Sequence, residues 1–209
     1  MNKPFWLVAF LLCLEIVLIM VLLPGDVVQQ AIHKEAGYVE HTLGAEAQGM
    51  LMEKANQWHQ SLLFDSGVYD SLYYTLIPTE KQREASGSIK TMGSGWFRVV
   101  ENRLEALSLV VYQLLARFAL VLTWAPYMLL LLIPALYDGY MTWQIKRTNF
   151  AYVSPVIHRY SVRGALILVG VMAIGFFLPV AIDPTIIPLV LMVVCILMGL
   201  ATGNMQKRI

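Results

Sequence analysis

Apolar residues are concentrated in four runs, each of them long enough to cross a lipid bilayer as a helix. A membrane-spanning helix needs about 20 mostly apolar residues. The runs occupy residues 1–23, 107–137, 164–182 and 185–204. We predict one transmembrane helix for each run. Only Asp183 and Pro184 separate the last two runs, which predicts a tight helical hairpin.

A regular apolar seam leads into the second run and predicts one long helix over residues 96–136. Its members alternate steps of three and four residues: Phe97, Val100, Leu104, Leu107, Val111, Leu114 and Phe118. This spacing is that of the a and d positions in a coiled coil. The seam is expected to pack on a helix of the same chain or on another subunit.

The polar stretch over residues 24–106 is predicted to form a small helical domain between the first two spans. Over residues 27–60, apolar residues recur at helical spacing, namely Ile32, Ala36, Val39, Leu43, Ala47 and Met50. A single helix is therefore predicted there. The tyrosine-rich residues 64–77 predict a second, shorter helix.

The composition supports a membrane protein. Of the 209 residues, 58% are hydrophobic and only 14% are charged. Soluble domains average about 25% charged residues, and disordered chains carry more charge and fewer apolar residues. The net charge of +1 shows no basic excess of the kind that binds nucleic acid.

The distribution of Lys and Arg predicts the orientation. If the N-terminus is cytoplasmic, the cytoplasmic segments carry seven basic residues against one acidic residue. The stretch between the first two spans then carries seven basic against eleven acidic residues. Because basic residues favour the cytoplasmic side, we predict a multi-pass membrane protein with both termini cytoplasmic and an exported domain over 24–106. The first run is predicted to be an uncleaved anchor, because no small-x-small site precedes Asp26.

Enzyme and metal motifs are missing from the sequence. There is no HExxH, Walker or GxSxG motif. His33 and His41 lie eight residues apart, and both cysteines, Cys13 and Cys195, lie in apolar runs. We therefore predict no catalytic residue, no metal site and no cofactor.

Glu15 is the exceptional residue of the first span, since a carboxylate in a bilayer must be paired, protonated or turned to a polar cavity. It is predicted to lie at a helix contact, to bind a partner subunit or to serve an ion pathway. Arg117 is expected nearer the outer end of the second span and not to pair with it. In the last span, Gly199 and Gly203 form a GxxxG motif, which allows close helix packing within the chain or in a dimer.

The segment over residues 138–163 is predicted to be a cytoplasmic loop rich in aromatic and basic residues. Asp138 and Gly139 are expected to end the second span, and Ser154-Pro155 is expected to begin a helix. The segment is interpreted either as an interfacial belt or as a docking surface for a cytoplasmic partner, and direct contact with nucleic acid is not expected. The predicted partner-binding residues, with Glu15, are Trp143, Lys146, Arg147, Ser154, Pro155, His158 and Arg159.

This segment resembles the DtrJ-like membrane proteins of conjugative plasmids and integrating conjugative elements. The resemblance rests on Pro-Ala-Leu-x-Asp-Gly from Pro134, on the residues just named between Trp143 and His158, on Phe150, and on two closing spans with a Lys-containing tail over 205–209. It implies a bacterial inner-membrane location, with the exported domain over 24–106 in the periplasm. It also implies a role in conjugative DNA transfer, beside the coupling ATPase and other membrane subunits of a type IV secretion system.

From pattern and resemblance together we predict an all-α membrane protein with four transmembrane helices. Its expected function is that of a non-enzymatic accessory or scaffold subunit of a conjugative transfer complex. The protein is expected to contact membrane lipid, and a homo-oligomer is compatible with the sequence. The alternative is a small channel or a proton-coupled transporter that uses Glu15.

Overall fold

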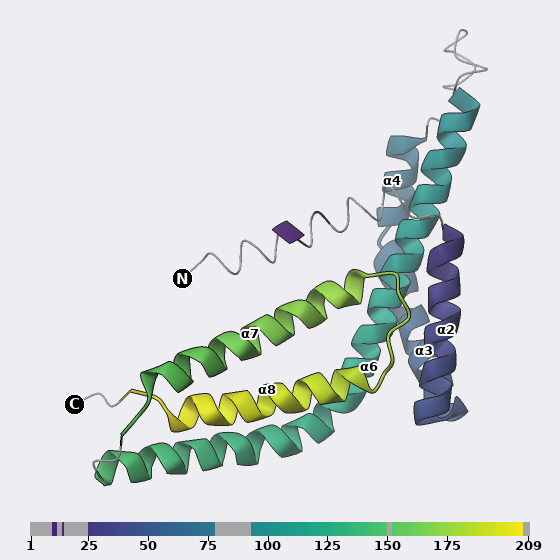
Figure 1. The fold of residues 1–209 in the computed structure, drawn as a ribbon. Helices are drawn as coiled ribbons and strands as arrows, with labels where there is room; N and C mark the ends of the chain where they lie inside the picture. The colour runs from purple at the N-terminus through teal and green to yellow at the C-terminus, as the bar shows by residue number, and fades with distance from the viewer. Residues whose placement is uncertain (1–9, 12–13, 15–24, 78–92, 150–151, 207–209) are drawn as a thin grey trace. The chain divides into compact units, whose positions relative to one another are not determined.

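The computed structural model describes residues 10–11, 14, 25–77, 93–149 and 152–206. All regular structure in these residues is helical, as predicted (Figure 1). The elements are α2 (Gly25–Leu43), α3 (Ala45–His59), the π-helical turn η1 (Gln60–Asp65), α4 (Val68–Leu76), α6 (Gly93–Thr148), α7 (Pro155–Phe177) and α8 (Ile186–Gly203).

Three helices in the described residues are long and apolar enough to cross a membrane. They are α6 over Phe97–Thr148, α7 and α8. The chain is thus shown to have three such helices in its described part, not the four that were predicted for the whole. The first predicted span, residues 1–23, lies almost entirely outside the described residues.

The chain divides into two compact units. Unit 1 comprises residues 1–119 and 176–182, and unit 2 comprises residues 120–175 and 183–209. The long helix α6 contributes its N-terminal half to unit 1 and its C-terminal half to unit 2.

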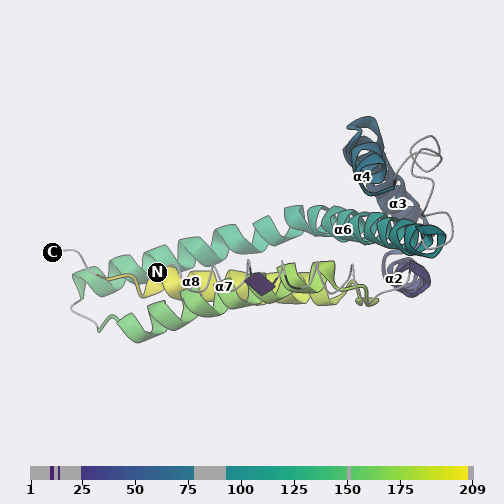
Figure 2. The same cartoon turned by 90° about the horizontal axis from the view of Figure 1, so that it is seen from above.

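In unit 1, α2 and α3 lie on different sides of α6 (Figure 2). Val28 of α2 packs against Val110 of α6, so one face of the first turns of α2 is buried there. On the other side, the His59 ring lies 3.0 Å from the Ser108 hydroxyl, and the Tyr112 hydroxyl donates to Met52 at 3.6 Å. These contacts show that α3 runs antiparallel to α6.

Residues 27–60 form two helices, not the single helix that was predicted. The chain turns at Gly44, whose φ of +89° favours glycine. The buried faces are therefore separate: Val28, Ala31, Glu35 and Val39 on α2, and Leu51 and Ala55 on α3. Met50, which was expected on the buried stripe, is 60% exposed because that stripe assumed one continuous helix.

The helix α6, which carries the apolar seam, is covered by α2 on one side and by α3 on another (Figure 2). Leu104 is buried, and Phe97, Val100, Leu107, Val111 and Leu114 are partly buried. Phe118 is 49% exposed, with its ring 6.0 Å from that of Trp58. Ala106, Val110, Gln113 and Arg117, which are outside the seam, are all buried. Packing between two helices of the same chain explains why the buried surface is wider than one seam.

In unit 2, α8 runs in the same direction as α6 and α7 runs against it. The Cys195 thiol lies 3.9 Å from the Met128 carbonyl oxygen near one end, and Lys146 contacts Gly203 near the other. α7 meets α8 through His158 and the Ala201 carbonyl.

The predicted loop over 138–163 is mostly helical. α6 continues past Gly139 to Thr148, and α7 begins at Pro155. Gly139 does not end the helix. It allows α6 to pack closely on α8, because a Cβ at this position would overlap the Thr202 side chain and the Gly199 carbonyl of α8. The predicted start at Ser154-Pro155 is confirmed, since the Ile157 N–H donates to the Ser154 hydroxyl at 3.3 Å.

α7 and α8 form the predicted antiparallel hairpin, but the connection between them is longer than predicted. α7 ends at Phe177, and no regular helix is present between Phe177 and Ile186. Residues 164–182 are therefore not one uninterrupted helix. Pro179 disfavours helical backbone at Leu178. The buried guanidinium of Arg117 binds the carbonyl oxygens of this connection.

Candidate partner-binding site

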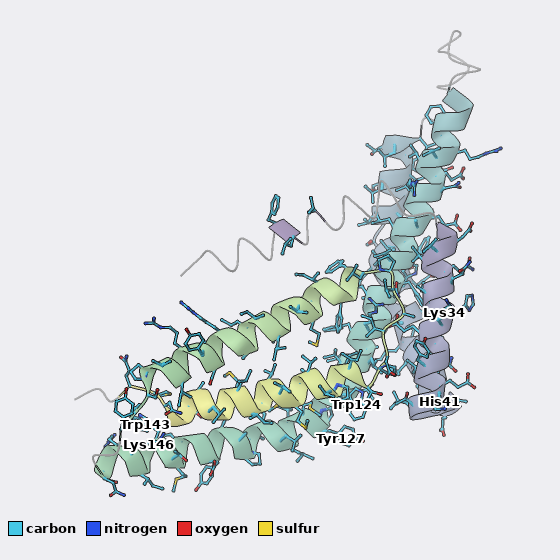
Figure 3. The ribbon with its side chains drawn as sticks, in the orientation of Figure 1. Lys34, His41, Trp124, Tyr127, Trp143 and Lys146 are labelled. Carbon is cyan, nitrogen blue, oxygen red and sulfur yellow. The ribbon has the colours of Figure 1, made fainter. Side chains whose placement is uncertain are left out.

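Most of the predicted partner-binding residues lie at one end of unit 2. Trp143, Lys146 and Arg147 occupy the last turns of α6, and Figure 3 shows the first two at the end of that helix. Ser154 and Pro155 form the start of α7, and His158 and Arg159 lie in its first turns. Glu15, the remaining predicted contact, lies outside the described residues.

Lys146 and His158 bind the C-terminal end of α8. The Lys146 ammonium donates to the Gly203 carbonyl at 3.2 Å and to the Asn204 side-chain oxygen at 3.0 Å. His158 Nδ1 lies 2.8 Å from the Ala201 carbonyl oxygen. Because a carbonyl only accepts, Nδ1 must carry the proton. The last carbonyls of a helix lack intrahelical donors and attract cations, so these two residues stabilise unit 2.

The structural role of Lys146 predicts a difference between neighbouring positions. Lys146→Met should lower the free energy of unfolding by about 1–2 kcal/mol, because a charge-assisted hydrogen bond at a helix end is lost. Arg147→Met, one residue away and exposed, should change it by less than about 0.5 kcal/mol. Unfolding of the purified variants in SDS, followed by tryptophan fluorescence, measures both. Equal losses at both positions would contradict the assignment.

Arg147 contacts an aromatic pair on the same helix. Its guanidinium carbon lies 5.5 Å from the centroid of the Trp143 ring, and that ring stacks on Tyr140 at 5.8 Å. The Trp143 Nε1 atom is buried and has no hydrogen-bond partner in the described structure. This cation–π arrangement holds Arg147 in place while leaving the residue exposed.

Four exposed side chains at this end of unit 2 form what we call the aromatic-basic edge: Arg147, Tyr152, Arg159 and Tyr160. Tyr152 is 80% exposed and Tyr160 is 67% exposed. Both arginines are exposed. The structure thus separates the predicted docking residues into those that hold unit 2 together and those that face outward.

Gly199 and Gly203 pack against α6 of the same chain. A Cβ at Gly199 would lie 2.9 Å from the Ala135 carbonyl oxygen, and one at Gly203 would lie 3.4 Å from the Gly139 carbonyl oxygen. These short distances show that the GxxxG motif is occupied by an intrachain contact in unit 2. Gly139 is the complementary small residue on α6.

Sequence reasoning missed a buried ionic network in unit 1. Arg117 is 1% exposed, and its Nε and Nη2 each donate to a different Glu35 oxygen at 2.8 Å. Gln113 donates to the same carboxylate at 2.7 Å. Nη1 donates to the carbonyl oxygens of Phe176 and Leu178, both at 2.8 Å, and Nη2 to that of Val180.

This network joins three segments of unit 1, one of which is the connection that follows α7. A guanidinium has five N–H donors, and the five bonds use all of them. The carbonyl oxygens that accept hydrogen bonds from Arg117 lie at the end of α7 and in the stretch that follows it. The network is saturated, so its role is to fix α2, α6 and residues 176–180, not to bind a ligand.

No metal centre is formed by the residues that the structure describes. Among them, no group of three His, Cys, Asp or Glu side chains could hold an ion. His33 and His41 are both exposed on α2. This end of unit 2 consists of contacts between helices and of exposed arginine and tyrosine side chains.

Comparison with known proteins identifies one family. The model of one protein family, described as IncC plasmid conjugative DNA transfer protein DtrJ-like, matches residues 22–208. No curated protein and no solved structure matches the chain. The match extends well beyond the segment on which the resemblance rested and includes both units. The chain therefore belongs to the DtrJ-like family of conjugative DNA transfer proteins.

Proposed function

We propose that this protein is a non-enzymatic accessory subunit of a conjugative transfer complex in the bacterial inner membrane, and that it associates with the coupling ATPase. In this proposal residues 24–106 lie in the periplasm, and the aromatic-basic edge lies in the cytoplasm. The observation that carries it is the outward-facing edge of Arg147, Tyr152, Arg159 and Tyr160 in a chain of the DtrJ-like family.

The chemistry of the edge suits a protein partner. Tyrosine and arginine are enriched at the energetic centres of protein interfaces. The planar guanidinium groups of Arg147 and Arg159 have the geometry that suits bidentate binding of a carboxylate. Two exposed arginines supply too few phosphate contacts for strong binding to DNA. We therefore assign the edge to an acidic surface of the ATPase.

The apolar surfaces of unit 2 support a position within the bilayer. Leu130, Ile133, Leu166 and Ile167 each expose more than 60% of their surface. In water such side chains would favour aggregation, whereas in a membrane they contact lipid or the helices of other subunits. The membrane subunits of a secretion system are the partners that we propose for them.

Charge reversal tests the docking role. Arg147→Glu with Arg159→Glu should lower the frequency of DNA transfer about 100-fold, because two guanidinium–carboxylate contacts become repulsive. The amount of protein in the membrane fraction should not change, since both side chains are exposed. Mating assays together with immunoblots of membranes measure the two quantities.

A matched control carries the same change in charge elsewhere. Lys34→Glu with Arg98→Glu alters two exposed basic residues of unit 1; Figure 3 shows Lys34 on α2. We expect wild-type transfer from this control. Normal transfer in the Arg147/Arg159 variant, or an equal loss in the control, would refute docking through the edge.

A further inference from the structure

A row of side chains runs along one side of α3 and continues onto η1. Met50, Lys54 and Trp58 follow one another at intervals of four residues, and Leu62 comes four residues later. Met50 is 60% exposed, Leu62 is 54% exposed, and Lys54 is exposed as well. Phe118 of α6, 49% exposed, adjoins the row, because its ring lies 6.0 Å from that of Trp58. We call these five residues the Trp58 surface.

A cation lies over an aromatic ring at the centre of this surface. The Lys54 ammonium is 5.3 Å from the centroid of the Trp58 ring, which is itself partly buried. The neighbouring carboxylate of Glu53 is directed along another side of α3, where it accepts a hydrogen bond from Gln57 at 3.4 Å. Glu46 lies at the opposite end of α3 from Trp58. The charge next to the tryptophan is therefore positive.

The Trp58 surface lies near the end of a helix that can cross a membrane. That helix is α7, and its last residues belong to unit 1. Arg117 donates to the Phe176 carbonyl oxygen there, and the next residue of α6, Phe118, packs its ring near that of Trp58. The first charged residue after α7 is Asp183. The membrane surface is expected between the end of α7 and this residue, which places Trp58 close to it.

We propose that the Trp58 surface binds the headgroup region of the lipid bilayer and so holds α3 at the membrane surface. The inference rests on the membrane location that the proposed function requires. Tryptophan is enriched where proteins pass through the headgroup region. A lysine beside it lays its apolar stem along hydrocarbon, while its ammonium binds a lipid phosphate. Met50, Leu62 and Phe118 supply further apolar contacts around this pair.

The lysine in the middle of the row argues against a protein as the occupant. Lysine is depleted at the centres of protein interfaces, because its ammonium is strongly hydrated and loses that water on burial. A helix laid along the row would cover the Lys54 ammonium together with the Trp58 ring, since the two are in contact. At a membrane surface the ammonium stays hydrated and lies close to anionic phosphates. The closeness to the end of α7 selects the same occupant.

Tryptophan fluorescence with brominated phospholipids tests this inference on the full-length protein, reconstituted in vesicles of phosphatidylethanolamine and phosphatidylglycerol. Bromine quenches a tryptophan that it touches, so its position along the lipid tail reports depth. The signal of Trp58 is the difference between the wild type and Trp58→Phe. We expect bromine near the headgroup to quench this signal about twofold. Bromine near the tail ends should quench it much less.

Two tryptophans added to the Trp58→Phe variant serve as references. Leu130→Trp lies on α6 at a position that is 70% exposed within a membrane-crossing helix, and lipid bromine should quench it. His33→Trp lies on the exposed side of α2, two residues from the buried Glu35, and should not be quenched. If Leu130→Trp is quenched but Trp58 is not, or if tail-end bromine quenches Trp58 more strongly, the inference is overturned alone. An unquenched Leu130→Trp would refute the membrane location as well.

Charge reversal tests the contribution of the lysine. Lys54→Glu should lower the quenching of Trp58 by headgroup bromine to about half, because a carboxylate is repelled by lipid phosphates. Lys34→Glu makes the same change in charge at an exposed position of α2 and should leave the quenching unchanged. Equal quenching of Trp58 in the two variants would overturn the binding of headgroups by this surface.

Discussion

Replacement of Arg117 with leucine is expected to destabilise the protein by about 3–5 kcal/mol, a larger loss than we expect from any other substitution. The substitution leaves the Glu35 carboxylate buried without its cation and removes the donors for three carbonyl oxygens of residues 176–180. Unfolding in SDS, monitored by tryptophan fluorescence, measures the change. A lower frequency of DNA transfer should accompany the loss of folded protein.

Two further variants separate the causes of this effect. Arg98→Leu removes an exposed arginine from the same helix and should change stability by less than about 0.5 kcal/mol. Glu35→Leu with Arg117→Leu removes both charges, so it should be less destabilised than Arg117→Leu alone, because no buried carboxylate remains unpaired. A near-normal stability of Arg117→Leu would show that the network does not hold unit 1 together.

Replacement of Gly139 with valine is expected to have the second largest effect, about 3 kcal/mol or more. Even the first carbon of the new side chain would overlap the Thr202 hydroxyl and the Gly199 carbonyl. The backbone of α8 cannot yield as a flexible side chain could. α6 and α8 must therefore separate, and the same unfolding measurement should show a less stable unit 2.

Gly37→Ala provides the control for the loss of a glycine. A Cβ at Gly37 meets nothing within 4 Å, and the residue lies inside α2. Alanine favours helix over glycine by about 1 kcal/mol, so this variant should be as stable as the wild type or more so. If Gly139→Val were as stable as Gly37→Ala, the close contact between α6 and α8 would be incorrect.

The helical class and the start of α7 followed from local sequence patterns. Apolar runs of sufficient length predicted α6, α7 and α8 as spans, and Ser154-Pro155 marked the beginning of α7. These features depend on residues close together in the chain. A capping hydroxyl and a run of apolar residues can therefore be recognised without knowledge of the tertiary structure.

The helix ends that were predicted wrongly depend on distant residues. Gly139 is typical of a helix terminator until α8 is seen to pack against it. The connection after α7 is bound by Arg117, about 60 residues away. Its start had a local signal in Pro179, which disfavours helical backbone at the preceding residue. The contact of Gly139 with α8 has no such signal in the local sequence.

The buried pair of Glu35 and Arg117 left a signal in the sequence that could not be recognised from either helix by itself. Glu35 interrupts the apolar stripe of Val28, Ala31 and Val39 on α2. Arg117 interrupts an apolar stretch between Leu114 and Phe118 of α6. A charge on a buried face needs an opposite charge, so two such interruptions imply a pair. Because the two residues are 82 positions apart in the sequence, neither helix by itself indicates that they pair.

The partner-binding residues were predicted as one group, although their roles differ. Lys146 and Arg147 are adjacent and both basic, but only Lys146 is directed at the end of α8. Composition alone does not separate a residue that satisfies a helix terminus from one that faces outward. The structure makes this distinction and restricts the proposed contact to the aromatic-basic edge.

Affinity purification of the tagged protein in mild detergent, from cells that carry its native transfer genes, tests the central proposal most directly. We predict that a coupling-type ATPase co-purifies in near-stoichiometric amount with the wild type and with the Lys34→Glu/Arg98→Glu control. We also predict loss of that ATPase from the Arg147→Glu/Arg159→Glu variant. Recovery of the wild-type protein alone, or only as a homo-oligomer, would contradict the proposal.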